Sequence, residues 1–563
     1  MATPTFDHLY DYEELTTTLH GLAALRPDLM TVESIGKSHE GREILLATAT
    51  NSRTGPHHEK PAIWVGANIH SVEHTGAVAA LHLLHTLITS YDTDERIAYA
   101  VDTRTFYVVP RINPDGAELS LAVPPTYLRS STRKWPRTDD APGLVERDVD
   151  CDGRILSMRI EDPNGAWKKS EHDQRLLVAR AADDYHAGPY YRLLAEGDVR
   201  DYDGATIPIA PERRSLDLNR QFPAQWRVAG EQQGAGPAPL SEPETRAVAD
   251  AVIARPNICA YFCHHTFSGA ILRPFDDRPD DDMPTLDLRR FNALAARGTE
   301  LTGYKHVSVF HDFRYDPKDV ITGGEDTWAY DHLGVYAWTT EFWSPIVKAG
   351  ITDFHFIKWF DDHPVSDDLA LLRYSDDELG ATGFVDWYEF DHPQLGKVEL
   401  GGWNWFRFWT NPPDHLLEAE VAPHTEWEIF CALATPRLVM REVITERVAE
   451  RVWRIRVVVE NDGWMPTNVT ERAIDRKLVR GVEAELTLTP DARLVRGNTS
   501  VELGQLAGRS RVTTMLGDFG STTDGTPDRG VAEWVVDAAA GTELCVTVSH
   551  PRAGFLRTNA VLA

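Results

Sequence analysis

The stretch Gly66-Ala-Asn-Ile-His-Ser-Val-Glu-His74 is the part of this sequence from which its fold and its chemistry can first be inferred. The apolar run 61–65 before it predicts a buried strand, and residues 75–85 after it predict a helix. His70 and Glu73 then stand at the carboxyl end of the strand, the edge where ligands bind in open α/β sheets. Two ligands separated by two residues commonly begin a zinc site. The alternative is that His70 caps the helix and Glu73 is an acid favoured by the helix dipole.

Strands and helices alternate around this stretch. Apolar runs predict strands, and amphipathic runs predict helices between them, so we expect an α/β sheet with helices on its faces, the strands at 42–50, 61–67, 105–110, 258–263 and 335–343. From about Pro436 the pattern changes to short alternating strands with turn signals, which is typical of a β-sandwich. We therefore predict a catalytic domain at 1–433 and a β-sandwich at 434–563. Within the first domain, 119–215 reads as a long irregular surface insertion.

The composition narrows the classes of partner. The 563 residues carry a formal net charge of −29, which argues against nucleic acid or an anionic membrane as partner. The N-terminus has no basic and apolar segments of a secretory signal, and no apolar run approaches the length of a membrane span. Five cysteines, an odd and scattered set, favour a reducing cytoplasm over a disulfide framework. The oligomeric state stays open.

Two later strand ends could supply the further residues that a metal site at His70 and Glu73 needs. Cys263-His264-His265 ends a buried strand, and because side chains alternate along a strand, only one of the two histidines can easily face the site. Glu341 lies in an apolar strand, where an acid is costly unless it is paired, bound to metal or kept for chemistry. A buried salt bridge is the alternative for Glu341.

With these residues the sequence resembles the zinc metallocarboxypeptidase family, of which carboxypeptidase A is the best-known member, across roughly residues 5–433. Six segments carry the resemblance in family order: His70-x-x-Glu73, Asn113-Pro-Asp-Gly116, Asp217-Leu-Asn-Arg-Gln-Phe222, Ser241-Glu-Pro-Glu-Thr245, His265-Thr-Phe-Ser-Gly269 and the strand that contains Glu341. The resemblance implies a mixed, mostly parallel sheet and an exopeptidase that removes C-terminal residues from peptides. It implies the following roles: zinc ligands His70, Glu73 and His265, a general base at Glu341, and a clamp for the substrate's terminal carboxylate at Asn219 and Arg220.

The sequence departs from the family pattern at three positions. An arginine that stabilises the oxyanion is expected after Asn-Pro-Asp-Gly, and we favour Arg129 over Arg133. The position of a substrate-capping tyrosine is occupied by Asp319, so that role is vacant or belongs to a residue such as Tyr315. Asp326 aligns with the specificity position, where an acid would favour a basic C-terminal residue; the alternative is that Asp326 caps the helix beginning at Thr327.

Two further features have a functional and a simpler interpretation. Asp148-Val-Asp-Cys-Asp-Gly153 resembles loops that wrap calcium, with Asp148, Asp150 and Asp152 as ligands, although no acid stands at the twelfth position; a solvated acidic turn is the alternative. The aromatic stretch 387–409 could line a substrate cleft, but we expect it to pack between the catalytic domain and the β-sandwich.

Two other functions remain compatible with the sequence. A deacylase or amidohydrolase acting on small N-acyl amino acids would need the same zinc site and carboxylate clamp. A non-catalytic protein that binds partners through its β domain would not need Glu341, so the presence of this residue with all three ligands favours an enzyme.

Overall fold

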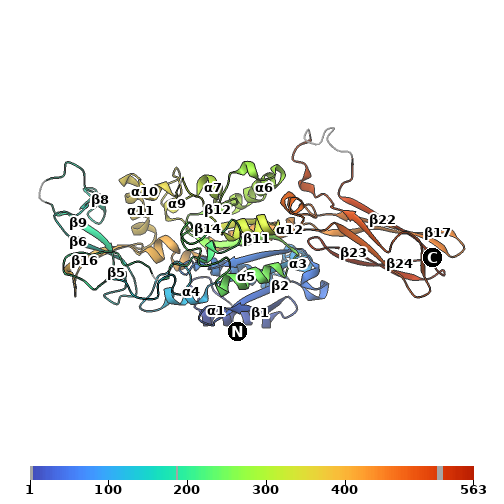
Figure 1. Cartoon of the computed structure of the whole chain (residues 1–563), viewed down its shortest axis with the longest axis horizontal. Coiled ribbons are helices and arrows are strands. Elements are labelled where there is room, and N and C mark those ends of the chain that lie inside the picture. Colours follow the sequence, from blue (N-terminus) through green and yellow to red (C-terminus); the bar gives the residue numbers. More distant parts are fainter. Residues whose placement is uncertain (1–3, 186–187, 213, 317, 516–523) are drawn as a thin grey trace.

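The computed structural model describes residues 4–185, 188–212, 214–316, 318–515 and 524–563. The molecule is elongated, with a helix-flanked sheet in the middle, a smaller sheet at one end and a pair of sheets at the other (Figure 1). No helix of the described residues is long and apolar enough to cross a membrane.

The central sheet has eight strands in the order β1-β2-β4-β3-β11-β14-β12-β13. Its middle is parallel from β4 to β14, and antiparallel strands stand toward the edges. Every residue of β11 is buried, because helices cover both faces of the sheet. This architecture confirms the predicted mixed α/β fold. The strand bounds are β1 Met30–Lys37, β2 Glu43–Ala49, β3 Ala62–Ala67, β4 Thr105–Val109, β11 Ile258–Thr266, β12 Ala270–Arg273, β13 Lys305–Ser308 and β14 Tyr336–Phe342.

Two sets of helices pack on β11, one on each face. Helix α2 approaches so closely that a side chain at Gly76 would meet His264 Cβ at 2.8 Å. On the other face Trp328 of α8 contacts the ring of Tyr261. Strand alternation therefore places His264 toward α2 and His265 toward α8. The main helices are α1 Tyr12–Leu25, α2 Thr75–Thr89, α3 Glu95–Thr103, α4 Pro114–Leu121, α5 Pro243–Ile253, α6 Thr285–Thr302, α8 Glu325–Leu333, α11 Val365–Glu378 and α12 Leu417–Ala434. Short helices are α7 Val309–Asp312, α9 Pro345–Lys348, α10 Lys358–Asp361 and α13 Glu471–Asp475.

The predicted irregular insertion at 119–215 is more ordered than expected. It contributes strands to a six-stranded sheet, order β15-β16-β6-β9-β7-β8, and its remaining two strands pair with each other. The hairpin β15–β16 comes from a segment more than 180 residues later in the chain. The prediction was wrong here because these strands are short and their partners are distant. The bounds are β5 Gly143–Glu146, β6 Ser157–Glu161, β7 Trp167–Lys169, β8 Leu177–Ala179, β9 Tyr191–Ala195, β10 Gly197–Arg200, β15 Phe384–His392 and β16 Gly396–Trp403.

The aromatic stretch 387–409 does not pack between the two domains, so that expectation was wrong. Phe408 and Trp409 lie in an apolar cluster with Trp359 and Leu371, on the side of the catalytic domain that faces the insertion. The cluster reaches the central sheet through Phe267, whose ring centroid lies 5.5 Å from that of Trp405. The aromatic stretch therefore packs beside the inserted sheet, at the end of the molecule away from the β-sandwich (Figure 1).

Residues after 437 form two antiparallel four-stranded sheets that face each other across a common apolar core, as predicted for a β-sandwich. One sheet has the order β17-β18-β22-β20 and the other β21-β19-β23-β24. Their bounds are β17 Leu438–Ala449, β18 Val452–Asn461, β19 Val482–Thr487, β20 Arg493–Arg496, β21 Ser500–Gly504, β22 Arg529–Asp537, β23 Glu543–His550 and β24 Gly554–Val561.

Candidate active site

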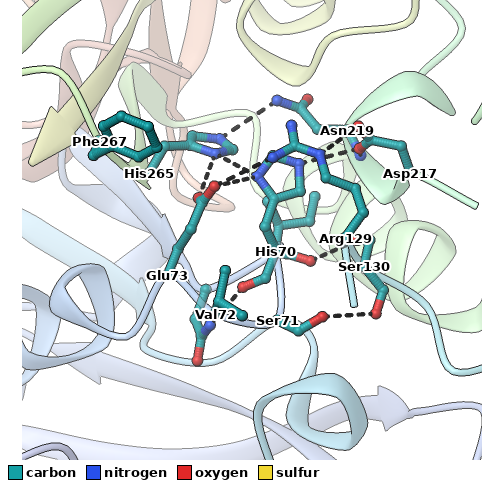
Figure 2. A network of polar contacts seen from close by, with 12 residues as sticks. His70, Ser71, Val72, Glu73, Arg129, Ser130, Asp217, Asn219, His265 and Phe267 are labelled. Atoms are coloured by element: carbon teal, nitrogen blue, oxygen red, sulfur yellow. Dashed lines mark hydrogen bonds and ion pairs between the residues drawn. The ribbon is translucent and has the colours of Figure 1, made fainter. Parts of the chain in front are cut away.

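Three side chains at the carboxyl edge of the central sheet converge on one point (Figure 2). His70 and Glu73 come from the turn after β3, and His265 is the penultimate residue of β11. The Nδ1 atoms of the two imidazoles lie 3.1 Å apart, and each is 2.9 to 3.0 Å from an oxygen of Glu73. All three residues are buried, between 2% and 3% exposed.

This donor set fits a zinc ion. Two nitrogens and a carboxylate are ligands that zinc accepts, and tetrahedral ligands about 2.1 Å from one ion lie roughly 3.4 Å from each other. Burial would raise the pKa of Glu73, but the two imidazoles beside it hold that pKa below its ordinary value. The carboxylate is therefore charged and available as a ligand. Among the described residues, His70, Glu73 and His265 form one of two groups whose atoms could hold a metal ion.

The outer nitrogen of each imidazole meets a carboxylate. Asp217 Oδ1 lies 3.1 Å from His70 Nε2, and Glu325 Oε1 lies 3.3 Å from His265 Nε2. Such contacts orient a histidine and select the ring nitrogen left for the metal. We did not single out Asp217 and Glu325 from the sequence, although each lies inside a segment with recognisable neighbours, next to Asn219 and Asp326 respectively.

Glu341 stands directly beside His265, because these two residues are partners in the parallel register of β11 and β14. Its carboxylate lines a cavity of about 50 Å³ together with both histidines. Desolvation raises the pKa of Glu341 to about 8, although the neighbouring His265 opposes the rise. A raised pKa makes this carboxylate, once ionised, a stronger base than an ordinary glutamate.

Two arginines approach the same cavity. Arg220 is 8% exposed and donates to the Asn219 carbonyl oxygen at 2.7 Å, and both residues line the cavity. Arg129 donates from Nε to Asp217 at 3.0 Å and lies 3.4 Å from Glu73, while 41% of its side chain stays exposed. The other arginine considered from the sequence, Arg133, instead pairs with buried Glu242.

The cavity has an acidic floor. Asp326 is 4% exposed and accepts a hydrogen bond from the Thr339 hydroxyl at 3.2 Å. Asp326 is the second residue of α8, and the N-cap of this helix is Gly324, so the interpretation that Asp326 caps the helix is wrong. Asp276, which no sequence pattern indicated, lines the same cavity, and burial raises its pKa with Asp326 adding to the rise.

Tyr315 lies at the entrance, where the cavity adjoins a groove of about 350 Å³ that also contacts Arg129 and Arg220. Its side chain is exposed. Asp319, at the position expected for a capping tyrosine, instead pairs with Arg227 at 3.0 Å. The ring of Phe267, two residues after His265, lies beside His265 in Figure 2.

The calcium-like loop differs in part from its prediction. Asp148 and Asp150 come together with Glu196, while Asp152 turns to Arg154, 2.9 Å from its Nε. Backbone amides already satisfy Asp148, and the Tyr388 hydroxyl donates to Asp150 at 2.5 Å. These contacts explain the turn without an ion, so calcium binding stays a prediction.

Two family models and several known carboxypeptidases match this chain. The zinc carboxypeptidase family matches residues 15–346, more than half of the chain, and a domain family of unknown function matches residues 437–561. Carboxypeptidase B of Astacus astacus is 26% identical over 340 residues, covering 59% of this chain and 85% of that protein. Carboxypeptidase A2 of Rattus norvegicus is 23% identical over 334 residues, and the match spans 61% of its length. Among solved structures, thrombin activatable fibrinolysis inhibitor matches with a TM-score of 0.42 at 16% identity, over 76% of this chain and 74% of that one.

Proposed function

This chain belongs to the zinc carboxypeptidase family, and from that premise we propose that it hydrolyses the last peptide bond of peptides with a free C-terminal carboxylate. The observation that carries the proposal is the position of Arg220. Its buried guanidinium lines the same small cavity as His70, His265 and Glu341. A forked cation at that place can hold a carboxylate while the preceding carbonyl reaches the metal donors.

We infer the following division of roles. Zinc, when bound by His70, Glu73 and His265, would polarise a carbonyl and acidify water. Glu341 would accept the proton of the attacking water and return it to the leaving amine, as its raised pKa allows.

Arg129 and Asn219 would act on the substrate's oxygens. Arg129 would face the carbonyl oxygen on which negative charge develops, because Asp217 and Glu73 orient its guanidinium while part of the side chain stays exposed. Asn219 would assist Arg220 at the terminal carboxylate. Tyr315 at the entrance is a candidate to cover the bound substrate.

We further propose that the C-terminal residue of the substrate is basic. Asp276 and Asp326 both line the cavity, where Arg220 opposes the rise in the pKa of Asp276 but does not cancel it, and a buried pair of acids is costly. Asp276 Oδ1 is buried and has no hydrogen-bond partner among the described residues. A lysine or arginine side chain would supply the missing charge and donors.

All five cysteines are free thiols. This supports the prediction that the protein works in the cytoplasm, where thiols stay reduced.

The test is mass-spectrometric digestion of a mixed peptide library by the zinc-loaded protein beside Glu341→Gln. This substitution keeps the shape of the side chain but removes the base. Stepwise loss of basic C-terminal residues by the wild type alone would support the proposal. If both proteins leave all peptides intact, the proposal fails, and cleavage of an N-acyl amino acid panel under the same conditions would favour a deacylase instead.

A further inference from the structure

Helix α8 joins the acidic cavity to the β-sandwich. At its N-terminal end the Glu325 amide donates to Asn219 Oδ1 at 2.9 Å, and the Glu325 carboxylate meets the zinc-ligand candidate His265. Asp326, the next residue, lines the cavity floor. The position of this helix therefore decides where the floor acid stands.

The C-terminal end of α8 is held by the β-sandwich domain. The Thr470 hydroxyl donates to the Gly334 carbonyl oxygen at 2.7 Å, and buried Arg552 donates to the carbonyls of Leu333 and Gly334. Gly334 ends the helix with φ of +64°, and a Cβ there would meet Ala473 Cβ at 2.7 Å. The two domains thus meet without a gap at this point.

Asp331, on the last turn of α8, adds an electrostatic connection. It is fully buried, and its carboxylate lies 3.2 Å from Arg472, on α13 of the β-sandwich domain, and 2.9 Å from Arg476, the residue that caps the C-terminal end of α13. Arg278 also pairs with it, at 3.2 Å, two residues after the second floor acid, Asp276. Both acids of the cavity floor are therefore connected to one carboxylate, which two arginines of the β-sandwich domain and Arg278 of the catalytic domain neutralise together.

A nine-residue helix is about 13 Å long, and its continuous backbone hydrogen bonding connects Asp331 with Asp326. A shift at Asp331 is thus transmitted to Asp326 rather than absorbed between them. A displacement of about 1 Å in a binding site can change catalysis by up to about a hundredfold.

We propose that the β-sandwich domain positions the pocket for the substrate's C-terminal residue, and that Asp331 with Arg472 and Arg476 are the positioning residues. The proposal rests on the proposed function, in which this cavity receives that residue. It gives the C-terminal domain a role inside the molecule, in substrate selection.

The test compares Asp331→Asn, Arg476→Ala and Arg476→Lys in the full-length, zinc-loaded protein. Arg493→Ala is the matched control, since Arg493 pairs with Asp537 in the same domain but away from α8. We expect Asp331→Asn to raise KM for the preferred peptide about tenfold, with kcat per bound zinc within about a factor of three. Arg476→Ala should have a smaller effect in the same direction, Arg476→Lys should restore part of it, and the control should behave like the wild type.

Amide hydrogen exchange measured on the same proteins separates this proposal from a merely structural role. We expect faster exchange in residues 325–329 and unchanged exchange in β22. A lower unfolding temperature with unchanged KM and unchanged exchange in α8 would overturn the proposal. If the wild type cleaves no peptide, the proposed function fails, but the exchange measurement still decides whether the β-sandwich domain positions α8.

Discussion

Substitution of Asp276 and Asp326, singly and together, should show whether the two acids share one negative charge or carry two independent charges. Burial raises the pKa of both residues, and for Asp276 the neighbouring Asp326 adds to the rise. Without a bound cation the pair therefore tends to keep a proton, as coupled carboxyl groups do. If one acid is replaced by asparagine, the other ionises more easily and the pocket keeps a negative charge. Only the double substitution Asp276→Asn with Asp326→Asn removes it.

The size of the effect follows from the dimensions of the cavity. A guanidinium about 5 Å from a carboxylate at an effective dielectric constant of about 20 gains roughly 3 kcal/mol. Desolvation of the cation leaves about 2 kcal/mol, which is about thirtyfold in kcat/KM. We expect each single variant to lose less than about fivefold on a peptide ending in arginine, and the double variant to lose about thirtyfold or more.

The assay measures kcat/KM on two peptides that differ only in a final arginine or phenylalanine. The phenylalanine peptide should be cleaved equally well or better by the double variant, since an apolar ring gains nothing from the acids. Equal losses on both peptides would refute the reasoning, because they would indicate a structural role for the pair. A loss in each single variant as large as in the double would show that the acids do not share a charge.

The same pair predicts a pH dependence with a definite sign. The negative charge forms only as pH rises above the ordinary aspartate range, because both pKa values are raised. Selectivity for arginine over phenylalanine should therefore increase with pH in the wild type. It should be flat in the double variant.

Three further predictions concern the metal, the carboxylate clamp and the stability of the fold. Removal of zinc by a chelator should abolish hydrolysis and lower the unfolding temperature, since a ligand at a hundred times its Kd adds about 2.7 kcal/mol to the free energy of unfolding; an unchanged unfolding temperature would contradict the site. Arg220→Ala should raise KM by about a hundredfold, because truncating a buried partner of a charged hydrogen bond costs about 2 to 5 kcal/mol. Arg220→Lys should recover only part of this, and a loss confined to kcat would refute the clamp. Burial raises the pKa of Glu244 to about 7. The free energy of unfolding should therefore fall by up to about 3 kcal/mol as pH rises from about 4.5 to 7, because the folded state holds the proton more tightly than the unfolded state. The unfolding temperature of Glu244→Gln should decline less steeply over that pH range than that of the wild type. The same pH dependence in both proteins would contradict this role of Glu244.

The candidate metal site could be predicted because its parts are local. His70 and Glu73 lie in one turn, and the strand before them is apolar enough to identify. Alternation along a strand predicted that only one of His264 and His265 faces the site, and the resemblance to the family motif selected His265. In the structure His264 lies on the opposite face, where it pairs with Glu428 at 2.6 Å. Glu341 was recognisable as an acid in an apolar strand, and the parallel register then places it beside His265.

The second acid of the cavity floor, Asp276, and the inserted sheet could not be predicted, because they depend on partners far apart in the chain. Asp276 follows β12, which enters the sheet antiparallel to β14, and no pattern around it suggests that it would meet Asp326. The strands of the insertion are only three to five residues long, and one of them, β6, completes its pairing with β16 some 240 residues later. A short strand carries little periodicity of its own, so its existence depends on the partner that satisfies its backbone.

The same limit applies to the proposed role of the β-sandwich. Asp331 reads as a surface acid near the end of a helix, and Arg472 and Arg476 read as solvated charges on another domain. Only their contact across about 140 residues of sequence reveals that the two arginines neutralise a buried carboxylate. Since removing the two arginines would leave the buried Asp331 carboxylate with Arg278 as its remaining ion-pair partner among the described residues, part of its compensating charge depends on the second domain. We therefore expect the catalytic domain, produced without residues 434–563, to fold poorly or to lose selectivity for the C-terminal residue, which limited proteolysis and peptide-pair kinetics would measure. A truncated protein with unchanged KM and selectivity would show that the cavity floor holds its shape without the second domain.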